Sequence, residues 1–140
     1  MIDITLAMID FLKADSPLAA LVGTRVFGGE LYESEAPFMP RKAVVLRGSG
    51  GASLLSQNYV PVTDQRFDIF SYGETPFEVS KVRRAVFTAL KELRRALIGG
   101  DVLIHWVEPA GGFVNLRDPD AGWPVNFQSF QALFDERAIA

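Results

Sequence analysis

Three features of the sequence have residue types that could carry chemistry: a single histidine, a glycine-rich stretch and a pair of aspartates. Base catalysis by His105 needs positioned partners, and spacing places no Ser, Cys or Asp constellation around it. The stretch Gly48-Ser49-Gly50-Gly51 lacks the Gly-Lys-Ser/Thr ending that sets a lysine on phosphate. Asp118 and Asp120 lack the further acids and the closing glutamate of a calcium loop. We therefore expect a structural histidine, a flexible loop and a turn, with no cofactor, metal site or enzymatic activity.

Length and composition further narrow the kinds of protein and functional site that the chain could have. At 140 residues the chain is long enough for one domain with a core of its own. It has no cysteine, which excludes disulfides, zinc–thiolate sites and thiol chemistry. No apolar stretch approaches the ~18 residues that a membrane span needs, so we expect no membrane partner.

Basic side chains are concentrated between residues 76 and 98. Against Glu78 and Glu92, this stretch holds Lys81, Arg83, Arg84, Lys91, Arg94 and Arg95, a net charge of +4 in a chain whose net charge is -3. A basic helix on an acidic body is not the charge distribution of a general nucleic-acid binder, because phosphate contacts need many uncompensated cations. It fits a surface that meets an acidic neighbour, such as another copy of the chain.

The same stretch has the strongest secondary-structure signal in the chain. Thr75 can accept a hydrogen bond at the start of a helix, Pro76 suits the first helical position, and Glu78 completes a capping box. Apolar residues then recur at helical spacing, and Gly99 can take the left-handed conformation that ends a helix. The pattern predicts a long helix over residues 76–98.

The remaining elements are predicted from periodicity and capping. Helices are expected over residues 4–13, after a cap at Asp3, and over 18–22, after a cap at Ser16. Extended segments are expected at 25–27, 43–47, 63–72, 102–108 and 125–135. Loops are expected at 28–42, 48–60 and 111–124. This order predicts a single α+β domain over residues 1–140: a small mixed, mostly antiparallel sheet of about four strands, with an N-terminal helix and one long helix packed on it.

Five local motifs follow one another along nearly the whole chain. They are residues 18–27, Pro-Phe at 37–38 before Val-Val-Leu-Arg at 44–47, residues 66–72, Val-Arg-Arg-Ala-Val at 82–86, and residues 116–122 before a phenylalanine-rich strand. In this order the chain resembles the tail completion, or tail terminator, proteins of long-tailed bacteriophages and prophages. It departs from them at residues 37–42, where the approach to the strand is longer than usual.

The resemblance implies a structural protein of the virion rather than an enzyme. Such proteins form a ring, usually a hexamer, at the head-proximal end of the tail tube, after assembly in the host cytoplasm. The partners implied are further copies of the chain, the tail tube protein and the head–tail neck or connector proteins. DNA would pass through the lumen without sequence-specific binding. The alternatives are another head–tail connector or neck protein, and a small cytoplasmic ligand-binding or regulatory domain.

Several candidate assembly residues keep more than one interpretation. The basic residues Arg84, Lys91 and Arg95 could pair across subunits with the acidic loop residues Glu30, Glu33 and Glu35. They could instead form a solvated stripe or face DNA in a ring lumen. The aromatic residues Trp123 and Phe130 could lie in the core or at an interface. The stretch Gly48-Ser49-Gly50-Gly51 is expected to form a mobile arm that projects into a neighbour or the tube.

Overall fold

A computed structural model describes residues 4–32, 34–53, 62–99, 102–119 and 121–136. The α-helices are α1 (Ile4–Ala14), α2 (Ser16–Val22) and α3 (Pro76–Lys91). The strands are β1 (Val26–Gly28), β2 (Ala43–Ser53), β3 (Val62–Tyr72), β4 (Ala96–Ile98), β5 (Val102–Arg117) and β6 (Pro124–Glu136). A short 3-10 helix, η1 (Ala36–Phe38), precedes β2. The predicted α+β class is thus confirmed.

The strands form one sheet in the order β1-β2-β3-β6-β5-β4. β1 runs parallel to β2, and every other neighbouring pair is antiparallel. A mixed, mostly antiparallel sheet is therefore confirmed. The expected number of about four strands is too low, because the sheet among the described residues has six strands, of which β1 and β4 are edge strands of three residues each.

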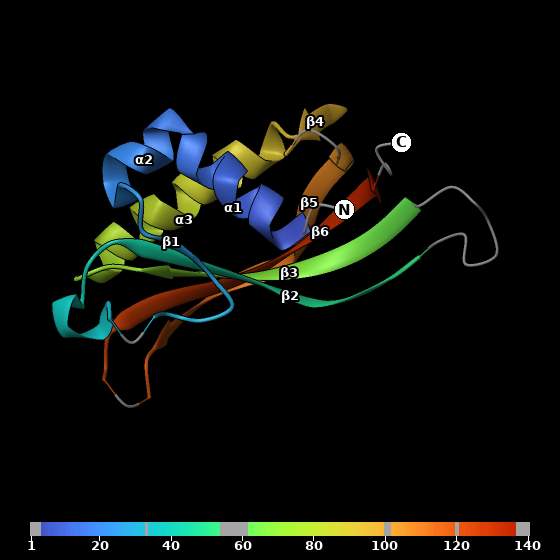
Figure 1. Cartoon of the computed structure of the whole chain (residues 1–140). Helices are drawn as coiled ribbons and strands as arrows, with labels where there is room; N and C mark the ends of the chain where they lie inside the picture. Colours follow the sequence, from blue (N-terminus) through green and yellow to red (C-terminus); the bar gives the residue numbers. More distant parts are fainter. Residues whose placement is uncertain (1–3, 33, 54–61, 100–101, 120, 137–140) are drawn as a thin grey trace.

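All three α-helices lie on one face of the curved sheet, and none of the described residues forms an α-helix on the other face (Figure 1). The core fills the space between the two layers. Met8, Leu12 and Leu90 from the helices pack there with Phe67 and Phe134 from the sheet, and none of these side chains is more than 1% exposed. Because side chains alternate along a strand, the sheet has an inner face under the helices and an outer face opposite.

The cap of the second helix lies one residue earlier than predicted. Asp15, not Ser16, is the cap of α2, and its carboxylate accepts a hydrogen bond from the backbone N–H of Leu18 at 3.1 Å. Pro17 then lies at the second helical position, where its missing N–H removes no intrahelical bond. Both candidate caps have suitable side chains, so local sequence alone does not separate them. Asp3, the predicted cap of α1, lies outside the described residues.

The long helix begins as predicted and ends early. Thr75 caps it by accepting a backbone N–H hydrogen bond at 3.3 Å. The helix ends at Lys91 rather than at residue 98. Arg95 has a φ of 50°, in the left-handed region, and the chain reverses there into β4, which pairs with the start of β5. Leu93 and Leu97 continue the helical spacing, so the strand pairing that ends the helix cannot be read from the local pattern.

The glycine-rich stretch lies in a strand, so the prediction of a loop beginning at Gly48 is wrong. β2 continues through Gly48, Ser49, Gly50 and Gly51 to Ser53, and its pairing with β3 has one irregularity near Gly48. Glycine and serine have low strand propensity, but the ladder to β3 satisfies their backbone groups. Deleting residues 49–53 would therefore remove strand pairing instead of shortening a loop.

The predicted loop over residues 111–124 is mostly strand as well. β5 continues past Pro109 to Arg117, with irregular pairing to β6 between Pro109 and Phe113. Proline is tolerated because β5 has no described strand partner on its other side beyond Ile104. The connection to β6 shrinks to a tight turn, in which the Ala121 N–H donates to Asp118 Oδ1 at 2.8 Å. Asp118 thus lies in the expected turn, while Asp120 lies outside the described residues.

Candidate assembly surface

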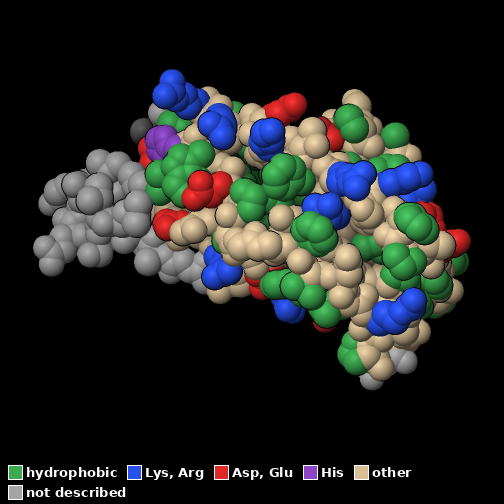
Figure 2. Space-filling view, turned by 180° about the vertical axis from the view of Figure 1, so that it is seen from behind, with side chains coloured by type: hydrophobic (Ala, Val, Ile, Leu, Met, Phe, Trp, Pro, Cys, Tyr) green, Lys and Arg blue, Asp and Glu red, His purple; other side chains and the backbone are tan. Residues whose placement is uncertain are grey.

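The side of α3 that faces β5 is called here the α3–β5 flank. Along this flank the helix lies next to the part of β5 that has no described strand partner on its outer side. Its central contact is the guanidinium of Arg83, which lies 3.8 Å from the centre of the Phe113 ring. Partial burial lowers the pKa of Arg83 from its ordinary value, and the neighbouring charge of Arg84 lowers it further. Figure 2 views the molecule from behind Figure 1 and shows basic side chains spread around hydrophobic patches on this side.

A hollow of about 170 Å³ lies on this flank, between the C-terminal half of α3 and β5. It is lined by the apolar residues Phe87, Val107, Pro109 and Phe130 and by the charged residues Lys91, Arg94 and Glu108. Phe130 is 2% exposed, and its ring lies 6.3 Å from that of Phe87, so it is a core residue rather than an exposed interface residue. The charged side chains belong to exposed residues. The hollow therefore combines an apolar lining with a mostly cationic rim.

A second hollow, of about 250 Å³, lies at the other end of the flank. It is lined by Pro76, Val79, Asn115, Leu116, Arg117, Pro124 and Val125. Next to it, the buried Asn126 donates from Nδ2 to Asn115 Oδ1 at 2.9 Å. Asn126 Oδ1 and Gln128 Oε1 accept no hydrogen bond within the described part of the chain. This end of the flank is thus more polar than the first.

Five exposed cations on or near α3 have no side-chain partner among the described residues. They are Lys81, Arg84, Lys91, Arg94 and Arg95. Three of them, Arg84, Lys91 and Arg95, are the basic residues predicted to meet an acidic neighbour. Their exposure leaves them available to a partner, and the pairing itself stays a prediction.

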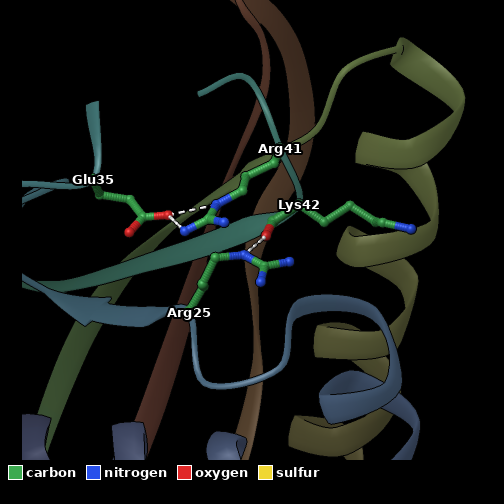
Figure 3. Close-up of polar contacts among 4 residues, drawn as sticks. All are labelled: Arg25, Glu35, Arg41 and Lys42. Carbon is green, nitrogen blue, oxygen red and sulfur yellow. Dashed lines mark hydrogen bonds and ion pairs between the residues drawn. The ribbon is translucent and has the colours of Figure 1, made fainter. Parts of the chain in front are cut away.

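The acidic loop is partly engaged within its own chain. Glu35 Oε1 accepts hydrogen bonds from both Nε, at 2.6 Å, and Nη2 of Arg41 (Figure 3). Arg25 Nε donates to the backbone carbonyl of Lys42 at 2.7 Å, and burial followed by the charge of Arg41 lowers the pKa of Arg25 (Figure 3). Lys42 Nζ in turn lies 3.7 Å from a carboxylate oxygen of Glu78 at the start of α3. Glu35 is therefore committed to holding this loop in place.

The rest of the acidic loop is exposed where it is described. Glu30 lies two residues after the end of β1, and its side chain is exposed. Tyr32 is 49% exposed, with its ring 4.9 Å from that of Phe27. Glu33 lies outside the described residues. Of the three predicted acidic residues, Glu30 thus remains the one described carboxylate that is free to meet a partner.

Exposed apolar residues on β5 are the part of the surface that sequence reasoning missed. Phe113, Val114 and Leu116 are each 47–48% exposed. Their alternation with Asn115 and Arg117 is a strand signal, but Gly111-Gly112 before them and the turn after them favour a loop. The predicted Trp123 is only half-buried and lies in the β5–β6 turn, where its backbone carbonyl accepts the Asp118 N–H at 2.8 Å.

Polar pairs cross the outer face of the sheet. Gln131 Nε2 donates to Asp64 Oδ2 at 2.6 Å, and Ser129 Oγ donates to Asp68 Oδ1 at 2.8 Å. The single histidine, His105, lies 3.2 Å from the buried Asp135 Oδ1 without forming a hydrogen bond to it. These pairs link neighbouring strands, and Asp135 on β6 is the charged neighbour of His105 on β5.

Two further tests concern the described residues only. No group of three or more His, Asp or Glu side chains among them is arranged to hold a metal ion. Their helices also fall short of the length and apolarity needed to cross a bilayer.

Comparison with known proteins finds likeness in structure and none in sequence. No protein-family model matches the chain, and no curated protein matches it. Among solved structures, a chain of the virion of a native gene transfer agent particle is similar in fold, with a TM-score of 0.69. The match covers 94% of this chain and 93% of the other at 19% sequence identity. The two chains therefore share a fold over nearly their whole lengths.

Proposed function

We propose that the chain is a structural protein of a phage-like virion and that copies of it form a closed ring at the head-proximal end of a tail tube. The ring ends tube polymerisation and offers a docking surface to the head–tail neck proteins. The observation that carries this proposal is the shared fold with a chain of a gene transfer agent virion, which extends over nearly all of both chains. The ordered motifs that resemble tail terminators point to the same role.

The arrangement of the sheet supports assembly in a ring. β1 lies at one edge of the sheet and pairs with only three residues of β2. Near the other edge, β5 pairs with β6 along its length, but beyond Ile104 its opposite side has no strand partner among the described residues. Unpaired strand edges are templates for pairing with another chain. When the surfaces that meet are different, contacts between copies run head to tail and close into a ring if the rotation permits. Exposed cations near one edge and an acidic loop near the other give such contacts complementary charge.

The tube-ending role is tested by tube length. The tail tube protein of the same particle is polymerised with and without this chain, and the tubes are measured in negative-stain images. A terminator shortens the tubes and adds density at one end only. A neck or connector protein leaves the tube length unchanged and binds only tubes that already carry a cap. A ligand-binding or regulatory domain binds no tube at all, which would contradict the proposal.

A further inference from the structure

We propose that the hollow between α3 and β5 receives the loop after β1 of a second copy, with Tyr32 of that copy in the hollow and Glu30 of that copy beside Lys91 and Arg94. The proposal rests on the proposed function, because it names the contact that would join neighbouring copies in the ring. In this contact, the loop near the β1 edge of one copy binds the hollow near the β5 edge of the next copy.

The hollow has the size and lining that an aromatic side chain needs. An apolar cavity of about 150 Å³ accepts a benzene ring, and this hollow measures about 170 Å³. Phe87, Pro109 and Phe130 contribute ring and aliphatic surface to its lining. Aromatic pairs gain stability beyond the area that they bury when their rings meet edge to face or offset.

The loop after β1 has the matching chemistry. Tyr32 is half exposed although its ring already contacts Phe27, so a large aromatic surface is left facing solvent. Two residues before it, Glu30 is exposed and carries a negative charge. Arg41 holds Glu35, three residues after Tyr32, and so anchors the chain on the far side of the loop. An anchored loop loses less conformational entropy when it binds.

The charges at the hollow determine which edge of a second copy binds there. Lys91 and Arg94 line the hollow and have no described partner, whereas Glu108 is the one acidic residue among those that line it. Exposed ion pairs add little affinity in water, so the aromatic ring must supply most of the binding. The cations favour an acidic loop over a basic one and so direct the β1 edge of one copy to the β5 edge of the next. The two surfaces lie at opposite edges of one sheet, as head-to-tail assembly requires.

Disulfide trapping tests the contact directly, because the natural chain has no cysteine. Glu30→Cys and Arg94→Cys are made as separate single-cysteine proteins, mixed and oxidised, and the combined Glu30→Cys/Arg94→Cys protein is oxidised alone. A disulfide forms only where the Cα atoms come within about 7 Å. We expect a disulfide-linked dimer from the mixture and a ladder of linked species from the combined variant. The matched control replaces Glu30→Cys with Asp10→Cys, an exposed acid on α1.

Tyr32 gives an independent readout. Tyr32→Ala should raise the concentration of half-assembly by about tenfold or more, because an aromatic anchor is lost, whereas Tyr32→Phe should leave it nearly unchanged. Equal thermal melting of the monomeric variants controls for loss of the Phe27 contact.

The outcomes separate this inference from the function on which it rests. Rings that form without the Glu30–Arg94 disulfide, or that link equally well through the Asp10 control, overturn the inference and leave the ring intact. Linked species that never close support the contact and count against the ring. Absence of both rings and disulfide overturns both.

Discussion

At the scale of single residues, Arg95 combines a left-handed backbone with an exposed side chain that contacts no described charged partner. Its φ of 50° is one that residues with a Cβ rarely adopt, at a cost of about 1–2 kcal/mol. Its backbone N–H donates to the His105 carbonyl at 3.2 Å, so the turn into β4 needs this conformation. Glycine would fit the turn with less strain. The side chain of Arg95 is exposed, so it offers the fold no buried contact that would offset this strain.

Arg95→Gly should therefore leave the free energy of unfolding unchanged or raise it by up to about 1 kcal/mol, because relief of strain offsets the greater freedom of the unfolded chain. Urea unfolding measures the change. Lys81→Gly is the matched control, since it removes an exposed cation from the interior of α3 and should cost about 1 kcal/mol. Equal destabilisation by the two glycine variants would contradict the account of Arg95.

Thr75 is a residue whose role could be predicted from sequence alone. Because its hydroxyl oxygen accepts the Glu78 N–H at 3.3 Å, Thr75→Ala should lower the free energy of unfolding by about 1 kcal/mol. Thr88, exposed in the middle of α3, provides the control, and Thr88→Ala should be neutral or slightly stabilising. The same urea experiment compares them, and a cost that is no larger at position 75 would remove the capping explanation.

At the scale of elements, the start of α3 could be predicted from the sequence and its end could not. The start of α3 depends on capping by residues that are adjacent in the sequence, so the local sequence is enough to predict it. Its end depends on residues 96–98 pairing with β5, a partner that local spacing does not reveal. The second half of β2 was missed for the same reason, because its glycines gain their regular structure from the ladder to β3.

Two glycines, Gly73 just after β3 and Gly48 within β2, make a matched pair for testing how closely α3 packs against the sheet. At Gly73, a Cβ would lie 2.9 Å from the backbone nitrogen of Val79 in the first turns of α3. Gly73→Ala should therefore push the helix from the sheet and cost about 1–3 kcal/mol. At Gly48, a Cβ would lie 2.7 Å from Gln65 Nε2, the end of a flexible side chain.

Gly48→Ala should consequently change the free energy of unfolding by no more than about 0.5 kcal/mol, since Gln65 can turn away. Urea unfolding of both variants provides the comparison. If Gly73→Ala were as mild as Gly48→Ala, α3 would not be packed against the end of β3 as closely as described.

At the scale of the whole molecule, the α+β class and the covered face of the sheet follow from periodicity. The candidate assembly surface could not be predicted in this way, because its hollow joins Phe87 and Lys91 to residues of β5 and β6 far along the chain. Basic charge near α3 could be predicted, while the apolar lining beside it could not. Trp123 and Phe130 show the same limit, since sequence identifies them as aromatic without telling a core ring from a surface ring.

Charge should matter to assembly more than to folding. The combined Arg84→Glu and Arg95→Glu variant should keep its thermal melting temperature, because both side chains are exposed and have no side-chain partner among the described residues. The same variant should lose its oligomer. Lys13→Glu reverses an exposed cation on α1 and should change neither the melting temperature nor the oligomer.

High salt should also weaken the natural assembly. Dissolved ions screen exposed charges over about 8–10 Å at ordinary ionic strength, and over a shorter distance at higher salt. Native mass spectra and melting curves report the two properties separately. An oligomer that survives the double reversal would assign these arginines to the solvated stripe.

The central claim is that copies of this chain close into a ring, and native mass across a concentration series tests it most directly, with negative-stain images of the same samples. The account predicts a closed oligomer, most simply a hexamer, that appears without open intermediates of every size and shows as rings, either free or at tube ends. A monomer at every concentration, with no density added to the ends of tail tubes, would contradict it.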